Sequence, residues 1–581
     1  MIVNYGKFIV RFILAMFIFW VATFFFLIGL WTVSLPVLLV GAYAVYRFKD
    51  SRFTRRYDAH FATPQELKPL AEEPMAGDGM LVGFAYNKPL AVRPGLAGKL
   101  EIGHFLFCGP NRAGKGLSIT SNLNYWQGSA IITDVKGEIS ELTAGYRQDV
   151  LGQKVFILNA SSGEMTHQFD PFAEMETDEQ ILSAATAYMN PNQDGDNAIF
   201  ARRASAMLAA IIRAGKVMNK PIIPTIDAAL FHPEGLKGAA LSLHALGDRM
   251  ITKWLNTFLG KDADKVDWEA AESARFLQNS WERLRTQAQP LTTQGVINMT
   301  GGRDFRASDL QDSNVTVYLV FRESELESTL PVFNLIVDAL LKSMMRRYDL
   351  NPKLRAGFNK TLAFFDEAYV AQPYNLPNYS ATASGRGIYL AVYVQALSQL
   401  AKWGKEGQTT LMENLHTKVF LPPVDRKDSS PDGTAAFVAD SCGEYMADDR
   451  NVGKNEHDHP LHSNVRLTPQ PLITASQFAL LPVGQSIVMT NNLPPILAHR
   501  LGPWRFEEFD IMKVYPMPDL PVRGDTVGQP VTLPAYPEPA PKPKATTPAR
   551  VKTPRATARP TAQPAPAAQQ TATTTEAEEA Y

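Results

Sequence analysis

Short apolar runs alternate with helical stretches between residues 57 and 515. Eight of these runs contain hardly a polar position between their ends. Nearly continuous hydrophobicity is typical of strands buried on both faces, so the pattern predicts a parallel sheet covered by helices and an α/β doubly wound fold. The expected strands are His104–Gly109, Ser129–Val135, Lys154–Ala160, Val315–Phe321, Thr361–Glu367, Ile388–Gln395, Thr417–Pro423 and Ser486–Asn492.

One block interrupts this alternation. Residues 178–305 show helical periodicity and hardly a strand, with one helix expected over Asn197–Met218 and another over Ala271–Gln289. The block therefore reads as an all-helical domain inserted into the α/β core. The core then consists of a first part, 57–177, and a second part, 306–515.

The N-terminal segment, 1–56, is expected to be a membrane anchor. No charged residue occurs from Phe12 to Tyr46. A single straight helix of that length would measure roughly 50 Å against a hydrocarbon core of about 30 Å, so two spans with a turn near Gly29–Pro36 fit better. One tilted helix is the alternative, and a cleaved signal peptide is disfavoured because its apolar region is much shorter. Basic residues flank both ends, which places both ends of the anchor in the cytoplasm: Lys7, Arg11, Arg47, Lys49, Arg52, Arg55 and Arg56.

The C-terminal segment, 516–581, is rich in Pro, Ala and Thr and has few large aliphatic residues. Such a composition cannot bury enough apolar surface to fold, so a disordered tail is expected.

Composition and net charge exclude few classes of function. The chain is 45% hydrophobic and 20% charged, and its net charge of −1 gives no sign of a strongly basic nucleic-acid binder. A ring can nevertheless be basic inside and acidic outside. The chain has two cysteines, Cys108 and Cys442, which argues against a disulfide framework and favours a reducing compartment.

A phosphate-binding loop is predicted where the first expected strand meets a helix. The spacing G-x-x-x-x-G-K is satisfied, whereas a glycine replaces the usual Ser or Thr after the lysine. Backbone N–H groups of such a loop surround the β-phosphate of a nucleotide, and the lysine reaches the β- and γ-phosphates. A glycine-rich turn without function is the alternative. The expected nucleotide-binding residues are Gly109, Pro110, Asn111, Arg112, Ala113, Gly114, Lys115, Gly116 and Leu117.

A second acidic motif supports this reading. Four apolar residues lead to Asp366 and Glu367 at the end of an expected strand, which is the Walker B arrangement. We expect Asp366 to hold Mg²⁺ and Glu367 to polarise the attacking water. An acidic pair that caps the next helix is the alternative. Gly116 leaves one magnesium contact unassigned; Ser118 need not face the metal, and water can complete the shell.

These motifs resemble those of the VirD4/TraG family of type IV secretion coupling proteins. "GPNRAGKG" is similar to the family's Walker A, where glycine after the lysine is usual. "DVKGEISELTAGYR", "FFDEAY", "GRGIYLAVYVQALSQL" and "PLITASQFALLPVGQSIVM" match in order, over about residues 80–505. The resemblance implies a RecA-like ATPase domain with an inserted all-α domain, an inner-membrane anchor and a hexameric ring. It implies ATP and Mg²⁺ as cofactors. It also implies recruitment of a relaxase–DNA complex, protein effectors or both to the components of a secretion channel.

Further roles are implied by the same resemblance. Gln395 matches the family's motif glutamine and would sense the γ-phosphate or orient water; an ordinary amide at the end of a strand is the alternative. Arg386 matches an arginine that would act in trans as an arginine finger; a structural or surface arginine is the alternative. Asp134, Lys136 and Glu138 follow a strand expected beside the loop and are assigned supporting roles.

Two other functions stay open at this point. One is a DNA translocase of the same fold outside secretion, and the other is a docking receptor that binds nucleotide without turnover. Three signals are assigned no function: the histidines His457, His459 and His462 in a polar stretch, Cys108 as a reactive thiol, and the arginine pairs Arg202–Arg203 and Arg346–Arg347 as nucleic-acid contacts.

Overall fold

The computed structural model describes most of the chain between residues 58 and 536. The described ranges are 58–71, 76–97, 100–162, 165–189, 197–371, 373–423, 433–451, 464–490, 493–502, 515–523 and 531–536, with seven single positions between residues 20 and 39. The predicted membrane anchor therefore lies outside the described residues apart from those single positions, and so does the tail from residue 537.

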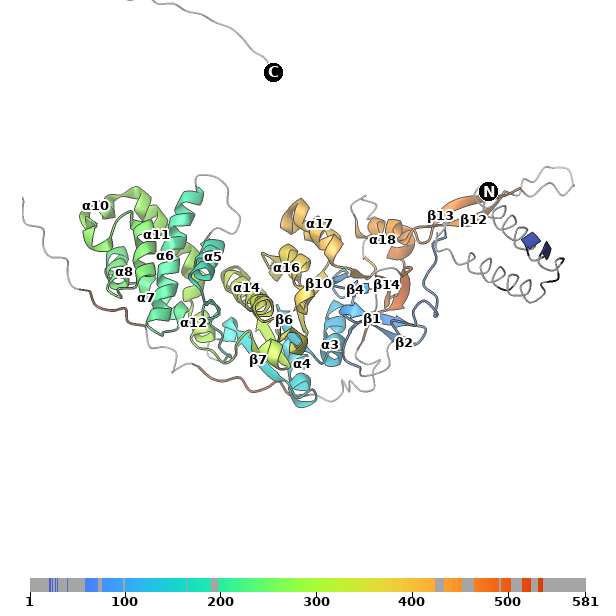
Figure 1. Cartoon of the computed structure of the whole chain (residues 1–581), viewed down its shortest axis with the longest axis horizontal. Helices are drawn as coiled ribbons and strands as arrows, with labels where there is room; N and C mark the ends of the chain where they lie inside the picture. Colours follow the sequence, from blue (N-terminus) through green and yellow to red (C-terminus); the bar gives the residue numbers. More distant parts are fainter. Residues whose placement is uncertain are drawn as a thin grey trace, which may run out of the picture. The chain divides into compact units, whose positions relative to one another are not determined.

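A mixed sheet of 11 strands forms the centre of the fold (Figure 1). Its order is β2-β1-β15-β14-β11-β5-β10-β9-β6-β8-β7. The strands are β1 (Met80–Ala85), β2 (Lys88–Val92), β5 (Phe105–Cys108), β6 (Ser129–Asp134), β7 (Lys154–Asn159), β8 (Val315–Val320), β9 (Thr361–Phe365), β10 (Ile388–Val394), β11 (Thr417–Phe420), β14 (Gln485–Met489) and β15 (Ile496–His499). Two hairpins stand apart from it: β3 (Gly95–Ala97) with β4 (Leu100–Ile102), and β12 (Glu444–Asn451) with β13 (Asn464–Pro471).

All eight strands expected from the sequence are present, and seven of them run parallel, from β11 to β7 in the sheet order. The eighth expectation is wrong in direction, because β14 pairs antiparallel with β11. The edge beyond it, made of β15, β1 and β2, is antiparallel throughout and was not predicted. The sheet is therefore mixed, with a parallel part that carries the phosphate-loop strand.

Alternate side chains of the parallel strands enter two separate cores. On one face, Phe105 and Phe107 pack with Ile119 of α3 (Lys115–Tyr125) and Ile139 of α4 (Glu138–Asp149). On the other face, side chains such as Leu106 enter a larger core. That core is covered by α14 (Leu326–Leu350), α16 (Leu376–Thr382), α17 (Gly404–Asn414) and α18 (Thr434–Cys442). This two-sided burial explains why the strands are apolar at nearly every position.

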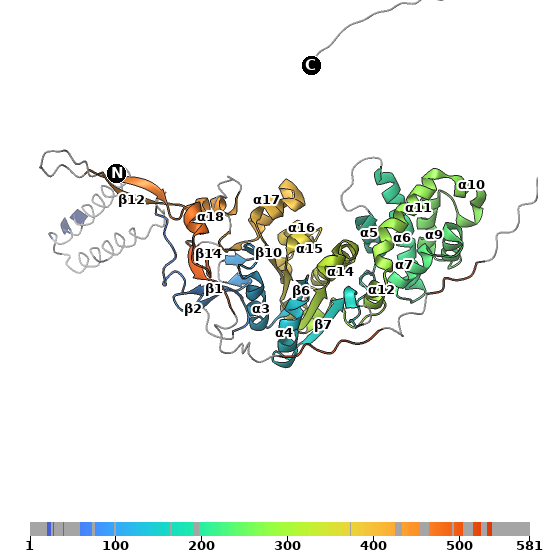
Figure 2. The ribbon, with the colours of Figure 1, turned by 180° about the vertical axis from the view of Figure 1, so that it is seen from behind.

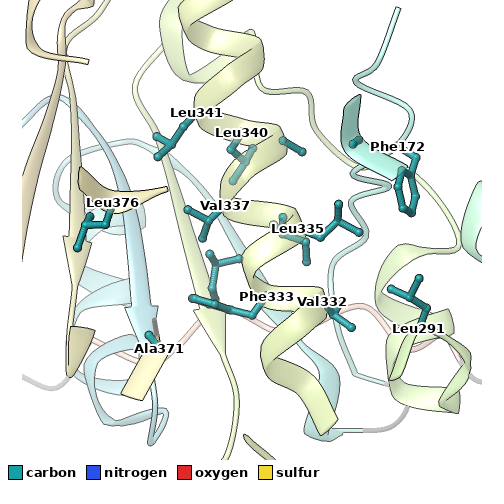
Figure 3. Close-up of a cluster of buried hydrophobic side chains, with 14 of the residues drawn as sticks. Phe172, Leu291, Val332, Phe333, Leu335, Val337, Leu340, Leu341, Ala371 and Leu376 are labelled. Atoms are coloured by element: carbon teal, nitrogen blue, oxygen red, sulfur yellow. The ribbon is translucent and has the colours of Figure 1, made fainter. Parts of the chain in front are cut away.

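Helix α14 packs against other segments of the chain on two opposite sides. Figure 3 shows its side chains Val337 and Leu335 pointing to opposite sides, toward Leu376 after the Walker B strand and toward Phe172 and Leu291 respectively. Among the described residues, its stretch Ser328–Leu350 alone is long and apolar enough to cross a bilayer, and 61% of its most apolar window is buried within the protein. In the structure it is a core helix.

The chain leaves the sheet after β7 and returns at β8, and in between the described residues form helices without strands (Figure 2). The expected helix at Asn197–Met218 is confirmed as α6, but the one expected at Ala271–Gln289 is broken at Ala274, which has an extended ψ of 95°. The helices are α5 (Asp178–Met189), α6 (Asn197–Val217), α7 (Ile222–Leu230), α8 (Gly235–His244), α9 (Arg249–Leu259), α10 (Trp268–Ser273), α11 (Arg275–Ala288) and α12 (Gln294–Thr300), followed by α13 (Asp309–Asp312).

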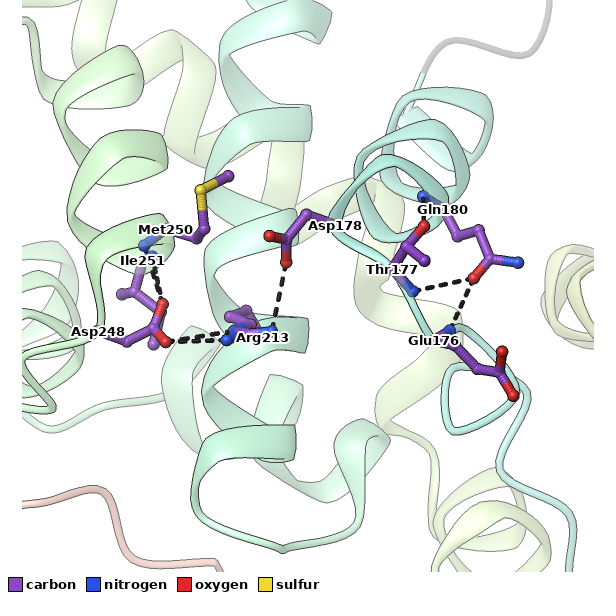
Figure 4. Close-up of polar contacts among 8 residues, drawn as sticks. All are labelled: Glu176, Thr177, Asp178, Gln180, Arg213, Asp248, Met250 and Ile251. Atoms are coloured by element: carbon purple, nitrogen blue, oxygen red, sulfur yellow. Dashed lines mark hydrogen bonds and ion pairs between the residues drawn. The ribbon is translucent and has the colours of Figure 1, made fainter.

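A polar contact ties three of these helices together, as Figure 4 shows. Arg213 of α6 forms ion pairs with Asp178 at the start of α5 (3.3 Å) and with Asp248 (3.0 Å). Asp248 also caps α9, because its side chain accepts hydrogen bonds from the N–H groups of Met250 and Ile251. The carboxylate of Asp248 thus caps α9 and forms an ion pair with Arg213 at the same time.

The segment from residue 516 was expected to be disordered, but its first part contacts the folded core. Thr166 donates its N–H to the carbonyl of Pro521 (3.1 Å), and Arg523 forms an ion pair with Asp304 (2.5 Å). Leu533 is buried. The composition argument fails here because these residues add to a core that already exists and need not form one of their own.

Candidate nucleotide-binding site

The predicted phosphate-binding loop connects the end of β5 to the start of α3. Gly109 donates its N–H to the carbonyl of Val394 in β10 (3.1 Å), and a Cβ on Gly109 would lie 2.6 Å from the Cβ of Leu421. Gly114 has a φ of 107°, a left-handed conformation that favours glycine. It immediately precedes Lys115, the first residue of α3. The backbone path therefore requires both glycines of the motif.

Lys115 is held over the loop. Its side chain is 6% exposed, and its Nζ donates to the carbonyls of Gly109 (2.9 Å) and Pro110 (3.3 Å). N–H groups in the first turn of a helix have no partner inside the helix. Those of Lys115, Gly116 and Leu117 therefore surround a point to which the lysine also brings a positive charge. This is the arrangement that binds phosphate.

The Walker B candidates follow β9 directly. Glu367 has a φ of 45°, which is uncommon for a residue with a side chain and costs roughly 1 kcal/mol or more. Its Oε1 lies 3.7 Å from the Nζ of Lys115, and the side chain is 18% exposed. The strained backbone thus brings a carboxylate from β9 to the lysine that follows β5.

Gln395 joins the same cluster from β10. Its Nε2 donates to the Oε2 of Glu367 (3.0 Å), while its backbone N–H donates to the side chain of Gln399 (2.7 Å). Strand β10 lies between β5 and β9 in the sheet. Lys115, Glu367 and Gln395 therefore meet at the carboxyl ends of three adjacent parallel strands, where α/β folds place their ligands.

Asp366 lies beside this cluster with an unusual proton affinity. Burial, together with the nearby charges of Glu367 and Asp134, raises the pKa of its carboxyl to about 7. Its backbone carbonyl accepts a hydrogen bond from Thr133 (3.1 Å). A carboxylate whose charge is poorly solvated and repelled by its neighbours is a favourable position for a cation.

Asp134 has a structural role. Its carboxylate accepts from the N–H groups of Gly137 (2.8 Å) and Ser140 (2.7 Å), so it caps the start of α4. Burial raises the pKa of this carboxyl despite those bonds. Lys136 and Glu138 are exposed, and neither forms an ion pair with Lys115 or Asp366. Of the three predicted supporting residues, Asp134 alone is linked to the site.

Arg386 lies away from this cluster. It precedes β10, whereas Gln395 follows it, so the length of the strand, roughly 20 Å, separates the two. Its guanidinium forms two hydrogen bonds of 2.9 Å with the carboxylate of Asp349 at the end of α14. Arg386 therefore does not reach the site of its own chain, and its predicted action in trans stays a prediction.

Sequence reasoning missed three residues that support the loop. The Nη1 of Arg500 donates to the carbonyl of Ala113 (2.9 Å). Leu421 packs against Gly109, and the hydroxyl of Thr434 accepts from the N–H of Leu397 (3.1 Å) and lies 4.0 Å from the sulfur of Cys108. All three come from segments far along the chain, and no local pattern marks them.

Cys108 was assigned no reactive role, and the structure agrees with that expectation. Cys108 is fully buried, and burial raises the pKa of its thiol to about 12, which makes it an inert small side chain. The three histidines lie outside the described residues. Among the described residues, no cluster of His, Cys, Asp and Glu has the form of a metal site.

Together the mixed α/β sheet and this loop define the class: a protein with a RecA-like nucleotide-binding fold and a Walker-type phosphate loop. The chain belongs to the family described as Type IV secretory system Conjugative DNA transfer, whose model matches residues 76–515. The resemblance stated from the motifs alone is thereby confirmed.

Individual relatives agree with this assignment. Conjugal transfer protein TraG of Escherichia coli is 23% identical over 338 residues, which are 55% of this chain and 52% of that protein. Protein VirD4 of Agrobacterium fabrum is 24% identical over 420 residues, 68% of this chain and 57% of that protein. The chain thus spans about half the length of the curated relatives it matches.

Solved structures share the fold. The bacterial conjugative coupling protein TrwBdeltaN70 matches with a TM-score of 0.56 at 16% identity, over 81% of this chain and 97% of that one. The plasmid coupling protein TrwB in complex with ADP and Mg²⁺ matches with a TM-score of 0.55, also at 16% identity, over 80% and 97%.

Proposed function

We propose that this chain is an ATPase that recruits substrates to a type IV secretion channel and couples ATP hydrolysis to their transfer. One observation carries the proposal: Lys115, Glu367 and Gln395 meet at the carboxyl ends of three adjacent strands, in a member of the conjugative DNA transfer family. A receptor without turnover would need no carboxylate beside the lysine. The structure of TrwB with ADP and Mg²⁺ supports a nucleotide ligand.

Each residue of the cluster has a role in this proposal. The loop from Gly109 to Leu117 binds the phosphates through its N–H groups, and Lys115 neutralises their charge. Glu367 polarises the attacking water and accepts its proton. Gln395 fixes the carboxylate of Glu367 through the 3.0 Å hydrogen bond. Arg386 would complete a neighbouring site in a homo-hexamer, which requires its pair with Asp349 to open.

The residues around Asp366 fit Mg²⁺. This ion prefers oxygen ligands and keeps several waters, so one carboxylate together with phosphate oxygens suffices. Ser118 does not replace the missing hydroxyl, since its Oγ lies 3.5 Å from the hydroxyl of Tyr393 in the core. Bound Mg²⁺ would neutralise charge on the phosphates during transfer. Asp366 would hold it, with water in place of a side chain from position 116.

Gly116 provides a direct test of the magnesium assignment. A Cβ at this position would meet no atom within 4 Å, so a side chain fits without rearrangement. We expect Gly116→Ser to supply the hydroxyl of the usual motif and to lower the Mg²⁺ concentration for half-maximal ATP hydrolysis several-fold, about 3- to 10-fold. The measurement is a Mg²⁺ titration of the hydrolysis rate at saturating ATP.

Gly116→Ala is the matched control for this substitution. It gains the same helix stability, roughly 0.5–1 kcal/mol, but has no oxygen to offer. We expect its Mg²⁺ dependence to equal that of the unsubstituted protein. Equal Mg²⁺ curves for the Ser and Ala variants would show that position 116 does not face the metal.

The remaining parts of the proposal concern location and partners. We infer that residues 12–46 anchor the chain in the bacterial inner membrane by two spans, with both termini in the cytoplasm. The helical block is proposed to be the inserted all-α domain, which contacts substrate. The proposed partners are channel components and a relaxase–DNA complex, protein effectors or both, and the proposed assembly is a homo-hexamer. Family membership supports each of these inferences.

The test is ATP hydrolysis by the full-length protein in lipid, with and without single- and double-stranded DNA. Turnover that DNA stimulates would support a nucleic-acid motor. Turnover indifferent to DNA would shift the cargo to protein. Absence of turnover under every condition, with nucleotide binding retained, would contradict the proposal and leave a docking receptor.

A further inference from the structure

A polar cavity lies outside the nucleotide-binding site. Its volume is about 330 Å³. Helix α14 and the two connectors that join the helical block to the sheet form its walls. Four of the ten lining residues are arginines: the lining consists of Glu174, Glu176, Arg303, Arg306, Ser308, Ser343, Arg346, Arg347, Leu350 and Asn351.

Two of the four arginines have carboxylate partners. Arg303 forms an ion pair with Glu174, and Arg347 pairs with Asp312 at 2.7 Å. Arg347 also donates to the carbonyl of Ser308 (3.1 Å) and stacks on the ring of Phe358. These contacts fix two sides of the cavity and use the charges of both arginines.

The other two arginines form no such pairs, although the charge of Arg346 helps to lower the pKa of the exposed Glu179. Neither Arg306 nor Arg346 forms a side-chain hydrogen bond or an ion pair with any described residue, and the Nε of Arg346 is buried without an acceptor. Glu176 is the remaining lining carboxylate and is exposed at the edge of the cavity. Arg306 is exposed and open to water, whereas the buried Nε of Arg346 lacks a hydrogen bond, which is costly without an anion.

The donor groups of the cavity suit a phosphate. A guanidinium offers a planar fork of N–H donors that matches phosphate oxygens, and it stays charged at any physiological pH. Ser308, Ser343 and Asn351 add neutral donors around the two free arginines. The volume is sufficient for a ligand larger than a single ion.

The cavity is separate from the Walker motifs. Helix α14 follows β8 and returns along the sheet, so its last residues lie near the amino ends of the strands. The ion pair between Asp349 of α14 and Arg386, which precedes β10, fixes this placement. Lys115 and Glu367 lie at the carboxyl ends. A ligand in this cavity therefore cannot be the nucleotide held by the phosphate loop of the same chain.

We propose that this cavity is a second phosphate-binding site, in which Arg306 and Arg346 bind a phosphate group of a nucleic-acid strand or of a free nucleotide. The site does not depend on ATP hydrolysis. Because the cavity joins α14 to both connectors of the helical block, an occupant would also hold these three segments together.

The experiment compares the unsubstituted full-length protein in lipid with Arg306→Gln/Arg346→Gln. One arm measures binding of a fluorescent single-stranded 20-mer at several salt concentrations. The other measures ADP binding by equilibrium dialysis in proteins that also carry Lys115→Ala, so that the first site is disabled. We expect the affinity in one arm to fall about tenfold. In the strand arm the slope of log K against log[salt] would fall by about 1.4, the value for two phosphate contacts.

Two further variants make the result specific. Arg202→Gln/Arg249→Gln removes the same charge from exposed positions of the helical block and is expected to leave both affinities within twofold. Arg346→Lys keeps the charge without the fork and is expected to lose part of the affinity. A loss in the strand arm alone assigns the site to nucleic acid, and a loss in the ADP arm alone assigns it to nucleotide. Unchanged affinity in both arms, or equal losses in the exposed control, would overturn the proposal.

Discussion

Lys115→Ala is expected to abolish ATP hydrolysis and to weaken nucleotide binding together. Its Nζ is held between two loop carbonyls and the carboxylate of Glu367, and no other described lysine or arginine forms an ion pair with that carboxylate. Loss of the positive charge leaves the phosphates to the backbone N–H groups alone. We expect the hydrolysis rate to fall at least about 100-fold, as happens when one charge-stabilising group is removed from a phosphoryl-transfer site.

Glu367→Gln is expected to separate binding from hydrolysis. The amide keeps the size of the side chain, so the contact with Gln395 persists, but it cannot accept a proton from water. We expect hydrolysis to fall about 10²–10⁴-fold, the range for loss of a general base, while nucleotide affinity changes little. Steady-state hydrolysis and equilibrium binding of a fluorescent nucleotide, measured on the same preparation, distinguish the two variants.

Lys405→Ala is the control for both, because Lys405 is exposed on α17 and far along the chain from both motifs. It is expected to hydrolyse ATP at the unsubstituted rate. Wild-type turnover in the Glu367 variant would remove that carboxylate from the reaction and would favour another base. Equal nucleotide affinity in the Lys115 variant would contradict the assignment of the phosphate loop.

The parallel part of the sheet was predictable because its strands are buried on both faces. Such strands have one recognisable pattern, an apolar residue at nearly every position. Ser486–Asn492 has the same pattern, yet β14 is antiparallel. Direction depends on how the chain returns to the sheet, and composition does not encode that. The neighbouring strands β1, β2 and β15 are short or contain Gly, Lys and Pro, so they were missed.

The parts of the site that are formed by short local motifs were predictable from the sequence. The phosphate loop and the acidic pair each occupy a few consecutive residues, and their chemistry fixes their spacing. Arg500 and Thr434 support the same loop from more than 300 residues away, and nothing in their neighbourhood reveals it. Arg386 shows the reverse case. A motif match suggested a catalytic role for Arg386. Its 2.9 Å pair with Asp349, which lies 37 residues earlier in the chain, is seen in the structure alone.

Arg147 contributes to stability through contacts that the sequence likewise did not reveal. It ends the motif "DVKGEISELTAGYR", in which no role was predicted for this residue. In the structure the guanidinium is completely buried, and burial lowers its pKa to about 10. No described carboxylate pairs with it. Instead it donates to five neutral acceptors on three segments of chain: the carbonyls of Leu123, Trp126 and Gly128 and the side chains of Gln153 and Thr316.

Arg147→Ala is therefore expected to destabilise the protein by about 3–5 kcal/mol, among the largest effects of any single substitution. The change opens a cavity and leaves buried carbonyls without donors, and each unsatisfied group costs about 1–3 kcal/mol before relaxation. These carbonyls join the end of α3 to the start of β6, so nucleotide affinity is expected to fall as well. The measurement is the denaturant midpoint of the protein in lipid, followed by fluorescence.

Arg147→Lys tests whether charge or geometry matters. Lysine keeps the charge but offers three donors from one atom in place of the fork, so it cannot reach five acceptors spread over three segments. We expect a midpoint between those of the alanine variant and the unsubstituted protein. Arg202→Gln on the exposed face of α6 should leave the midpoint unchanged. If the lysine variant were as stable as the unsubstituted protein, the buried charge alone would account for the effect; if the alanine variant were, the hydrogen bonds of Arg147 would contribute nothing to folding.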